Sequence, residues 1–253
     1  MIQNCNVAPQ EVFLSVIIPA CNEAPRLPKT LQRIHEYLTG SAFTYEILVT
    51  LDGSTDSTPE ILANLSHQIG HLTVLDRTDN RGKGFTVKEG MLRAKGQIRL
   101  FTDADNSTDI AHFDMMRPLF DHGYDLVIAS RNAKDTAGAQ QVVPQAAYKR
   151  FIGQIGNRIV RKVAVPGIWD TQCGFKAFRA EVAERIFRQT TIERWGFDIE
   201  VLALAQALKY RIGIIPAHWI NDERSHVRSM DYLRVLADTF AVRRNFLSGK
   251  YPL

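Results

Sequence analysis

Short apolar runs alternate with segments of helical periodicity along the first half of the chain. The runs that read as strands are residues 13–18, 45–50, 72–75, 98–102 and 125–130. The segments that read as helices are residues 28–38, a stretch that begins at Ser57, and residues 85–94. This alternation predicts an α/β fold in which helices flank a mostly parallel central sheet.

The second of these helices carries a strong start signal. Ser57 is a typical capping residue, Pro59 fits the first turn, and Glu60 can return a hydrogen bond to the cap. We therefore expect a capping box at this helix start.

The pattern changes after residue 131. Residues 132–141 are polar, show no packing face and are expected to be mobile, and an amphipathic helix should follow. Its apolar positions are Tyr148, Ile152, Ile155, Ile159 and Val163. The further expected strands are residues 175–178 and 213–215, and the further expected helices are residues 181–187, 197–208 and 229–247. No internal repeat or linker divides the chain, which predicts a single domain.

Two carboxylates, Asp103 and Asp105, follow the strand at 98–102 directly. Mg²⁺ and Mn²⁺ prefer such hard oxygen ligands and keep positions open for phosphate oxygens. The pair therefore indicates a divalent-metal clamp for a diphosphate. An Asp-x-Asp pair also occurs in ordinary solvated turns, so the neighbouring loops must decide.

Polar loops follow three of the predicted strands, at residues 19–23, 52–56 and 103–107. Ligands bind at the carboxyl ends of strands in open α/β sheets, so these loops should share one crevice. The first loop has no glycine, which argues against a dinucleotide oxidoreductase. Gly82-Lys83-Gly84 opens a helix, where free N–H groups favour phosphate, although the glycines can also simply turn the chain.

The charge of the chain is concentrated locally. Residues 144–165 carry +5 and residues 228–250 carry +3, whereas the whole chain carries +4. Such basic segments indicate an anionic partner: lipid headgroups, nucleic acid or a phosphorylated substrate. Nucleic acid is disfavoured because no binding motif accompanies the charge and the crevice is acidic. Three scattered cysteines, and the lack of a signal sequence or long apolar run, predict a cytoplasmic protein.

Taken together, the motifs resemble those of inverting nucleotide-sugar glycosyltransferases of GT-A fold, the family that includes dolichyl-phosphate mannose and glucose synthases. The residues that carry the resemblance are 16–23, 26–28, 51–56, 80–84, 103–105, 130–131, 170–176 and 194–200. The last two segments are most similar to the dolichyl-phosphate β-glucosyltransferase branch. The resemblance implies one GT-A catalytic domain over residues 1–253. Its expected parts are a nucleotide-sugar half at 1–131, an acceptor half at 132–228 and an amphipathic helix at 229–253.

The resemblance also implies roles for individual residues. The nucleotide-sugar site would contain Pro19, Ala20, Asn22, Glu23, Asp52, Lys83, Asp103 and Ala104. The metal, Mg²⁺ or Mn²⁺, would be held by Asp103 and Asp105; the acceptor phosphate would meet Arg131, Gln172 and Lys176; and the catalytic residues would be Asp105, Asp198 and Lys176. Cys21 and Leu51 depart from the family, where an aromatic residue and a second Asp are common. Ser107 stands where the mannosyl branch often has a third oxygen ligand.

The function expected from the resemblance is metal-dependent, inverting transfer of a hexose, glucose from UDP-glucose, to a polyprenyl or dolichyl phosphate. A hydroxyl acceptor would need a general base, with Asp198 as first candidate and Glu200 as second. These two side chains cannot both face the site, because they lie two residues apart on a helix. A phosphate acceptor is already anionic and needs no base. The alternatives are a soluble or glycan acceptor, or a sugar-nucleotide-binding module without activity.

The last helix is a candidate for contact with an anionic membrane surface. Its apolar residues Tyr232, Leu236, Phe240 and Leu247 are expected on one side. Arg234, Arg244 and Lys250 are available to lipid headgroups. An apolar stripe can equally pack on the core, and the sequence does not reveal the oligomeric state.

Overall fold

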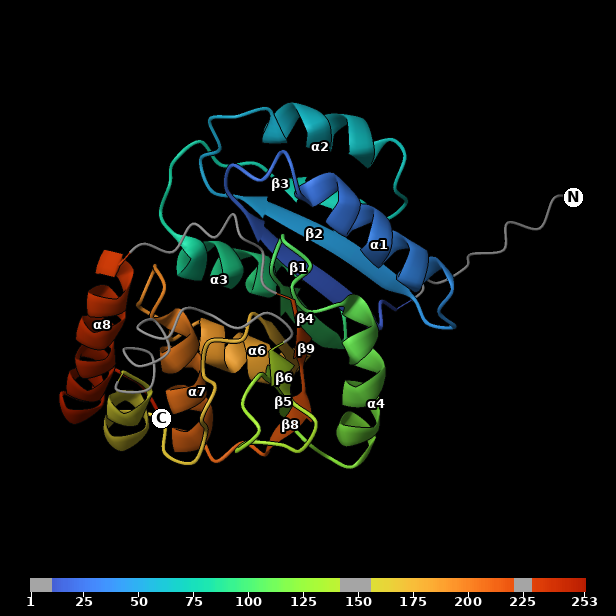
Figure 1. Ribbon diagram of the computed structural model, residues 1–253. Helices are drawn as coiled ribbons and strands as arrows, with labels where there is room; N and C mark the ends of the chain where they lie inside the picture. The colour runs from blue at the N-terminus through green and yellow to red at the C-terminus, as the bar shows by residue number, and fades with distance from the viewer. Residues whose placement is uncertain (1–10, 142–155, 221–228) are drawn as a thin grey trace, which may run out of the picture.

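A computed structural model of the protein describes residues 11–141, 156–220 and 229–253. Within them, seven strands form one sheet in the order β3-β2-β1-β4-β7-β5-β8 (Figure 1). The strands are β1 Leu14–Ala20, β2 Tyr45–Leu51, β3 Leu72–Leu75, β4 Ile98–Thr102, β5 Leu126–Ser130, β7 Phe175–Arg179 and β8 Ile212–Pro216. All pairings are parallel except those of β7, which runs antiparallel between β4 and β5. The prediction of a mostly parallel sheet is confirmed.

Helices cover both faces of this sheet and enclose two apolar clusters. One face is covered by α1 Leu27–Thr39, α2 Thr58–Ser66 and α4 Phe113–Asp121, which follows the short helix η1 Ile110–His112. The other face is covered by α3 Lys83–Arg93, α6 Ala180–Phe187, α7 Phe197–Ala207, α8 Ser229–Leu247 and a helix over 156–163. Strands from before and after residue 131 alternate in the part β4-β7-β5-β8 of the sheet, so the two expected halves share one sheet.

The expected capping box is absent, and the loop that was expected to be mobile makes defined contacts. Ser57 precedes α2 but makes no capping bond with its side chain; instead Asp56 Oδ1 accepts the Thr58 N–H at 2.9 Å. The loop 132–141 is anchored, because the carboxylate of Asp135 accepts from Ser130 Oγ at 2.7 Å and from the Asp170 N–H at 2.8 Å. Its end forms β6 Gln140–Gln141, which pairs with β9 His218–Trp219. Of the predicted amphipathic helix, Tyr148, Ile152 and Ile155 lie outside the described residues.

The last helix has two environments along its length. Val235 and Val242 of α8 pack on the core, and Tyr232 and Leu236 line a cavity together with Val235. Phe240 and Leu247 are exposed at 56% and 75%. The four residues expected on one side do share one side of this continuous helix, which borders the cavity near the start of α8 and solvent near its end.

Candidate functional site

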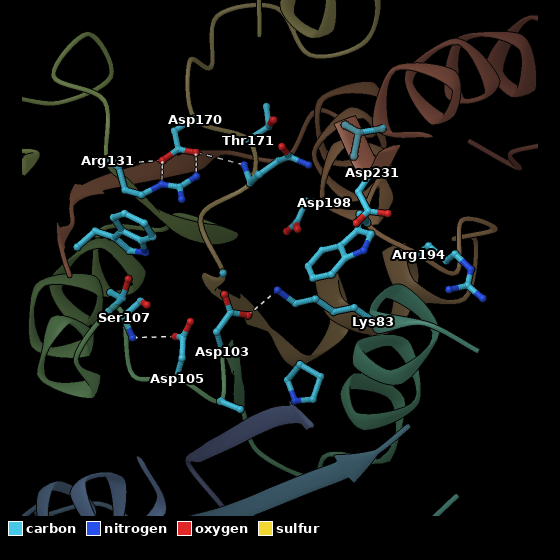
Figure 2. A pocket seen from close by; sticks show the side chains of 18 of the residues that line it. Lys83, Asp103, Asp105, Ser107, Arg131, Asp170, Thr171, Arg194, Asp198 and Asp231 are labelled. Carbon is cyan, nitrogen blue, oxygen red and sulfur yellow. Dashed lines mark hydrogen bonds and ion pairs between the residues drawn. The ribbon is translucent and has the colours of Figure 1, made fainter. Parts of the chain in front are cut away.

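A cavity of about 890 Å³ opens at the carboxyl ends of β1, β2 and β4. The loops after these three strands meet there, as the sequence predicted. The predicted site residues that line it are Pro19, Ala20, Asn22, Glu23, Asp52, Lys83, Asp103, Ala104, Asp105, Arg131, Gln172 and Asp198. Figure 2 shows five charged members of this set facing one space: Lys83, Asp103, Asp105, Arg131 and Asp198.

Asn22 and Asp52 fix the loops that border the cavity after β1 and β2. Asn22 Oδ1 accepts the Thr55 N–H at 2.7 Å and so ties the loop after β1 to the loop after β2. Asp52 accepts from the guanidinium of Arg77 at 2.5 Å and from the Gly82 N–H at 2.8 Å. The Asp52 carboxylate therefore supplies the anion at the start of α3 and fixes the loop that carries Lys83.

Gly82 and Gly84 allow a second segment to approach α3. A Cβ atom on Gly82 would lie 2.7 Å from the Glu193 carbonyl oxygen, and one on Gly84 would lie 2.6 Å from that of Ile192. Gly82 also has a φ of +108°, a conformation that favours glycine. Both glycines are thus explained by close packing against the segment 190–196, in addition to any contact with phosphate.

The carboxylate pair lies at the centre of the cavity. Asp103 Oδ1 is 2.5 Å from Lys83 Nζ, and Asp105 Oδ1 accepts the Ser107 N–H at 2.9 Å (Figure 2). Burial, followed by the charge of Asp103, raises the pKa of Asp105. Burial opposes the charge on Lys83, but Asp103 beside it keeps the pKa of this ammonium above its usual value. The two carboxylates of Asp103 and Asp105 and the ammonium of Lys83 therefore form a compact charged group.

This group fits a divalent cation that a ligand helps to coordinate. Among the residues that the structure describes, no three His, Cys, Asp or Glu side chains gather as a metal site. The Ser107 side chain is buried next to Asp105, whose Oδ1 accepts the Ser107 N–H, so a hydroxyl oxygen also lies beside this carboxylate. One or two carboxylates with waters and substrate phosphates are a usual Mg²⁺ environment.

Gly174 makes room for the Asp103 carboxylate. A Cβ atom on Gly174 would lie 2.1 Å from Asp103 Oδ2, and the Gly174 carbonyl accepts the Asp103 N–H at 3.2 Å. We expect Gly174→Ala to displace this carboxylate and weaken Mn²⁺ binding about tenfold or more, measured by calorimetry. Gly70→Ala is the matched control, because a Cβ there meets nothing within 4 Å. Unchanged Mn²⁺ affinity in the Gly174 variant would contradict the assignment of Asp103.

Lys176 does not reach the cavity. Its side chain is 0% exposed because it lies in the middle of the sheet, opposite Phe101 of β4 and Ile128 of β5. Lys176 Nζ donates to Asp198 Oδ1 at 2.5 Å and to the Cys173 carbonyl at 2.7 Å. The prediction that Lys176 contacts the acceptor phosphate is therefore wrong. The Lys176 ammonium is buried and instead holds the Asp198 carboxylate.

Asp198 faces the cavity, whereas Glu200 faces away. Burial raises the pKa of Asp198, and the nearby Lys176 and Lys83 oppose the rise. Glu200 is fully buried and accepts hydrogen bonds from the segment that precedes α7, including the Thr191 N–H at 2.9 Å. The prediction that only one of these two acids faces the site is confirmed, and Glu200 is excluded as a base.

Arg131 lines the cavity on the side across from Lys83 (Figure 2). Its Nε and Nη2 donate to the two carboxylate oxygens of Asp170 at 2.7 and 2.8 Å, so the guanidinium is fixed in a bidentate pair. The guanidinium also lies 5.3 Å from the ring centroid of Trp219. Arg131 and Gln172 both line the cavity, where they remain candidates for binding an anionic group.

Sequence reasoning missed several lining residues. The three tryptophans of the chain, Trp169, Trp195 and Trp219, all line the cavity, as do Arg194 and Asp231. Trp195 lies within a motif that carried the family resemblance, so its size and aromatic character could have identified it. Asp231 comes from α8, and no local signal distinguishes it from a surface helix acid. Figure 2 shows Asp231 and Asp198 on the same side of the cavity as Lys83.

Comparison with known proteins gives consistent matches. The family model described as Glycosyl transferase family 2 matches residues 15–187. A dolichyl-phosphate beta-glucosyltransferase of Dictyostelium discoideum is 34% identical over 96% of this chain and 77% of that protein. The protein of the same name from Homo sapiens is 32% identical over 95% of this chain and 78% of that protein.

Solved structures share the fold at low sequence identity. Mannosyl-3-phosphoglycerate synthase from Rubrobacter xylanophilus has a TM-score of 0.68 at 14% identity, over 96% of this chain and 76% of that one. Glucosyl-3-phosphoglycerate synthase from Mycobacterium tuberculosis, in complex with Mn²⁺, uridine diphosphate and phosphoglyceric acid, has a TM-score of 0.64 at 18% identity. That match covers 96% of this chain and 79% of the other.

Proposed function

The chain belongs to glycosyltransferase family 2, and from that premise we propose that it transfers glucose from UDP-glucose to a polyprenyl or dolichyl phosphate, with inversion at the sugar. It is a glycosyltransferase, as the family model and the named relatives indicate. The observation that carries the finer proposal is the group formed by Asp103, Asp105 and Lys83 at the centre of the cavity. The names of the relatives support the glucosyl group and the lipid phosphate.

In this proposal the donor lies along the loops after β1, β2 and β4. Pro19, Ala20, Asn22, Glu23 and Asp52 border the nucleoside, with Ala104 beside the diphosphate. A Mg²⁺ or Mn²⁺ ion held by Asp103 and Asp105 would supply positive charge to the leaving diphosphate.

Lys83 adds a fixed positive charge at the same point, since its ammonium lies against Asp103. Such charge stabilises the diphosphate as negative charge develops on it. A solved neighbour that contains Mn²⁺ and uridine diphosphate is consistent with this donor.

The acceptor phosphate would approach from the side of Arg131 and Gln172. Its oxygens already carry negative charge at neutral pH, because even the second ionisation of a phosphate monoester has a pKa of ~6. The nucleophile therefore needs no proton removed. Arg131 would orient it, and Asp170 fixes the direction of the guanidinium.

Asp198→Asn tests this acceptor. The variant also removes the buried partner of Lys176, so the rate is expressed per folded protein. If the nucleophile is a phosphate oxygen, this turnover number should fall less than about tenfold, because no proton transfer is lost. The buried carboxylate with a raised pKa favours the second candidate, a transferase with a hydroxyl acceptor. For that acceptor the same variant should lose roughly 100-fold or more. Steady-state rates with saturating donor distinguish the two results.

A panel of radiolabelled nucleotide sugars tests the proposal as a whole. Each donor is incubated with polyprenyl phosphate, with 3-phosphoglycerate or with no acceptor, in Mg²⁺, Mn²⁺ or chelator. We expect lipid-linked label from UDP-glucose with either metal and none with chelator. Label in a water-soluble product alone would support the second candidate.

Contact with a lipid surface is also part of the proposal. None of the helices in the described parts of the chain is long and apolar enough to cross a membrane. On α8, the exposed residues Leu233, Phe240 and Leu247 lie along one side, and Arg243 and Arg244 are exposed beside them. This combination is suited to an anionic membrane interface.

We expect Phe240→Glu to weaken binding to vesicles of phosphatidylserine and phosphatidylcholine by about tenfold, because it removes apolar area and adds a repelled charge. Sedimentation of protein with vesicles measures this. Met115→Glu on α4 is the matched control, since Met115 is exposed at 40% on another helix. Equal binding of wild type and the Phe240 variant would contradict a membrane role for α8.

A further inference from the structure

The segment 190–196 carries Arg194 and Trp195 into the cavity and leads into α7 with Asp198. Buried groups hold it in place. Glu200 accepts the Thr191 and Ile192 N–H groups at 2.9 Å each, and the Thr191 hydroxyl at 2.7 Å. Because Glu200 is 0% exposed, these bonds are not exchanged with water, and the segment is fixed to α7.

Tyr251 completes this support from the far end of the chain. Its hydroxyl donates to Glu200 Oε1 at 2.6 Å, and Asn245 Nδ2 donates to the same hydroxyl at 3.2 Å. Burial and the bond to Glu200 raise the pKa of Tyr251, which therefore stays protonated and able to donate. The phenol is 5% exposed, so it is a structural partner of Glu200 rather than a surface group.

α3 holds the other side of the same segment. The Phe85 N–H donates to the Glu193 carbonyl at 3.0 Å, and Lys88 Nζ donates to the Thr190 carbonyl at 2.7 Å. These bonds anchor residues 190–193, and at the other end Gly196 begins α7, with its carbonyl accepting the Ile199 N–H at 3.1 Å, so Trp195 lies between two fixed points.

Trp195 lies beside the place where the transferred sugar should be. Lys83 Nζ is 2.5 Å from Asp103 Oδ1 and 5.5 Å from the centroid of the Trp195 ring, within cation–π range. In a nucleotide-sugar the hexose is bonded directly to the second phosphate. A diphosphate bound at Lys83 and Asp103 thus directs the hexose toward Trp195 and Asp198, which line the same cavity.

We propose that Trp195 is the surface on which the transferred hexose stacks, and that Glu200 and Tyr251 position it. The inference rests on the proposed nucleotide-sugar donor and adds a sugar subsite to it. An indole presents an electron-rich face to the C–H groups of a sugar ring. Asp198, which lines the same cavity, supplies an acceptor for the sugar hydroxyls.

The test compares a ligand that has the hexose with one that lacks it. Calorimetry in Mn²⁺ gives the dissociation constants of UDP-glucose and UDP for wild type and Trp195→Ala. We expect UDP-glucose to bind roughly tenfold more weakly to the variant, whereas UDP affinity should change less than about twofold.

Tyr251→Phe should weaken UDP-glucose binding selectively as well, by about threefold, because Glu200 loses one donor and the segment loosens. Tyr210→Phe is its matched control, since Tyr210 packs on the same apolar cluster as α7 but follows the end of this helix, whereas the segment 190–196 precedes it. A role of Tyr251 in stability alone would lower the unfolding temperature without changing the ratio of the two affinities, and that result would overturn the positioning role.

Failure of the inference is distinguishable from failure of the proposed function. If wild type binds both ligands and transfers glucose, but Trp195→Ala weakens UDP and UDP-glucose equally, only the sugar subsite is wrong. If wild type binds neither ligand, the donor assignment itself is wrong and the subsite is rejected with it.

Discussion

Asp105→Ala is expected to lower the turnover number on the order of 1,000-fold while the protein stays folded. Asp105 lies in the cavity beside Asp103, and its Oδ1 is oriented by the Ser107 N–H. Its removal takes away a ligand of the proposed metal. The departing diphosphate is then stabilised mainly by the positive charge of Lys83. Initial rates with UDP-glucose and polyprenyl phosphate measure the loss, and circular dichroism checks the fold.

Asp114→Ala is the matched control for this prediction. Asp114 is an exposed acid on α4 that accepts from the Tyr37 hydroxyl at 2.7 Å, outside the cavity. Its removal should leave turnover within about twofold, because surface substitutions change stability little. Near wild-type turnover in Asp105→Ala would contradict the proposed metal clamp.

Lys176→Met is expected to lower the free energy of unfolding by about 3–5 kcal/mol, since it leaves the Asp198 carboxylate buried without its cation. Lys176 and Asp198 have side-chain exposures of 0% and 5%, so water cannot replace the lost partner. Activity should fall together with stability, because Asp198 lines the cavity. Unfolding in urea measures the effect.

A second variant separates charge burial from lost packing. In Lys176→Met combined with Asp198→Asn no charge remains unpaired, so more than half of the lost stability should return. Arg33→Met is the control for an exposed pair: Arg33 and Asp109 have side-chain exposures of 50% and 32%, and the loss of this pair should leave the stability nearly unchanged. An equally small loss of stability in Lys176→Met would mean that the Lys176–Asp198 pair is solvated.

Much of the fold was predictable because the signals are local. Strands such as 98–102 are short apolar runs, and the prediction for β4 matches its observed bounds. The position of β7 between β4 and β5 was not predictable, since the order of strands in a sheet depends on contacts between distant residues. The capping box failed for a different reason: Asp56, one residue before Ser57, offered the helix a better acceptor.

Some residues of the candidate site were also predictable from local sequence signals, and others depend on contacts between distant parts of the chain. Residues that directly follow parallel strands, such as Asn22, Asp52 and Asp103, were found because strand ends meet at one edge of a sheet. Lys176 was placed in the correct motif, but its burial depends on the strands beside β7 and is not visible in sequence. Asp231 reaches the cavity only through the packing of α8, a tertiary contact that no local pattern announces.

This crevice is proposed to transfer a hexose from a nucleotide to a lipid phosphate. The most direct test is to incubate the wild-type chain with radiolabelled UDP-glucose and Mg²⁺ or Mn²⁺, in parallel with polyprenyl phosphate and with the matching polyprenol. We expect label in an organic-soluble, acid-labile product with the β configuration from the phosphate alone. Equal transfer to polyprenol, or no lipid-linked product from polyprenyl phosphate, would contradict the account.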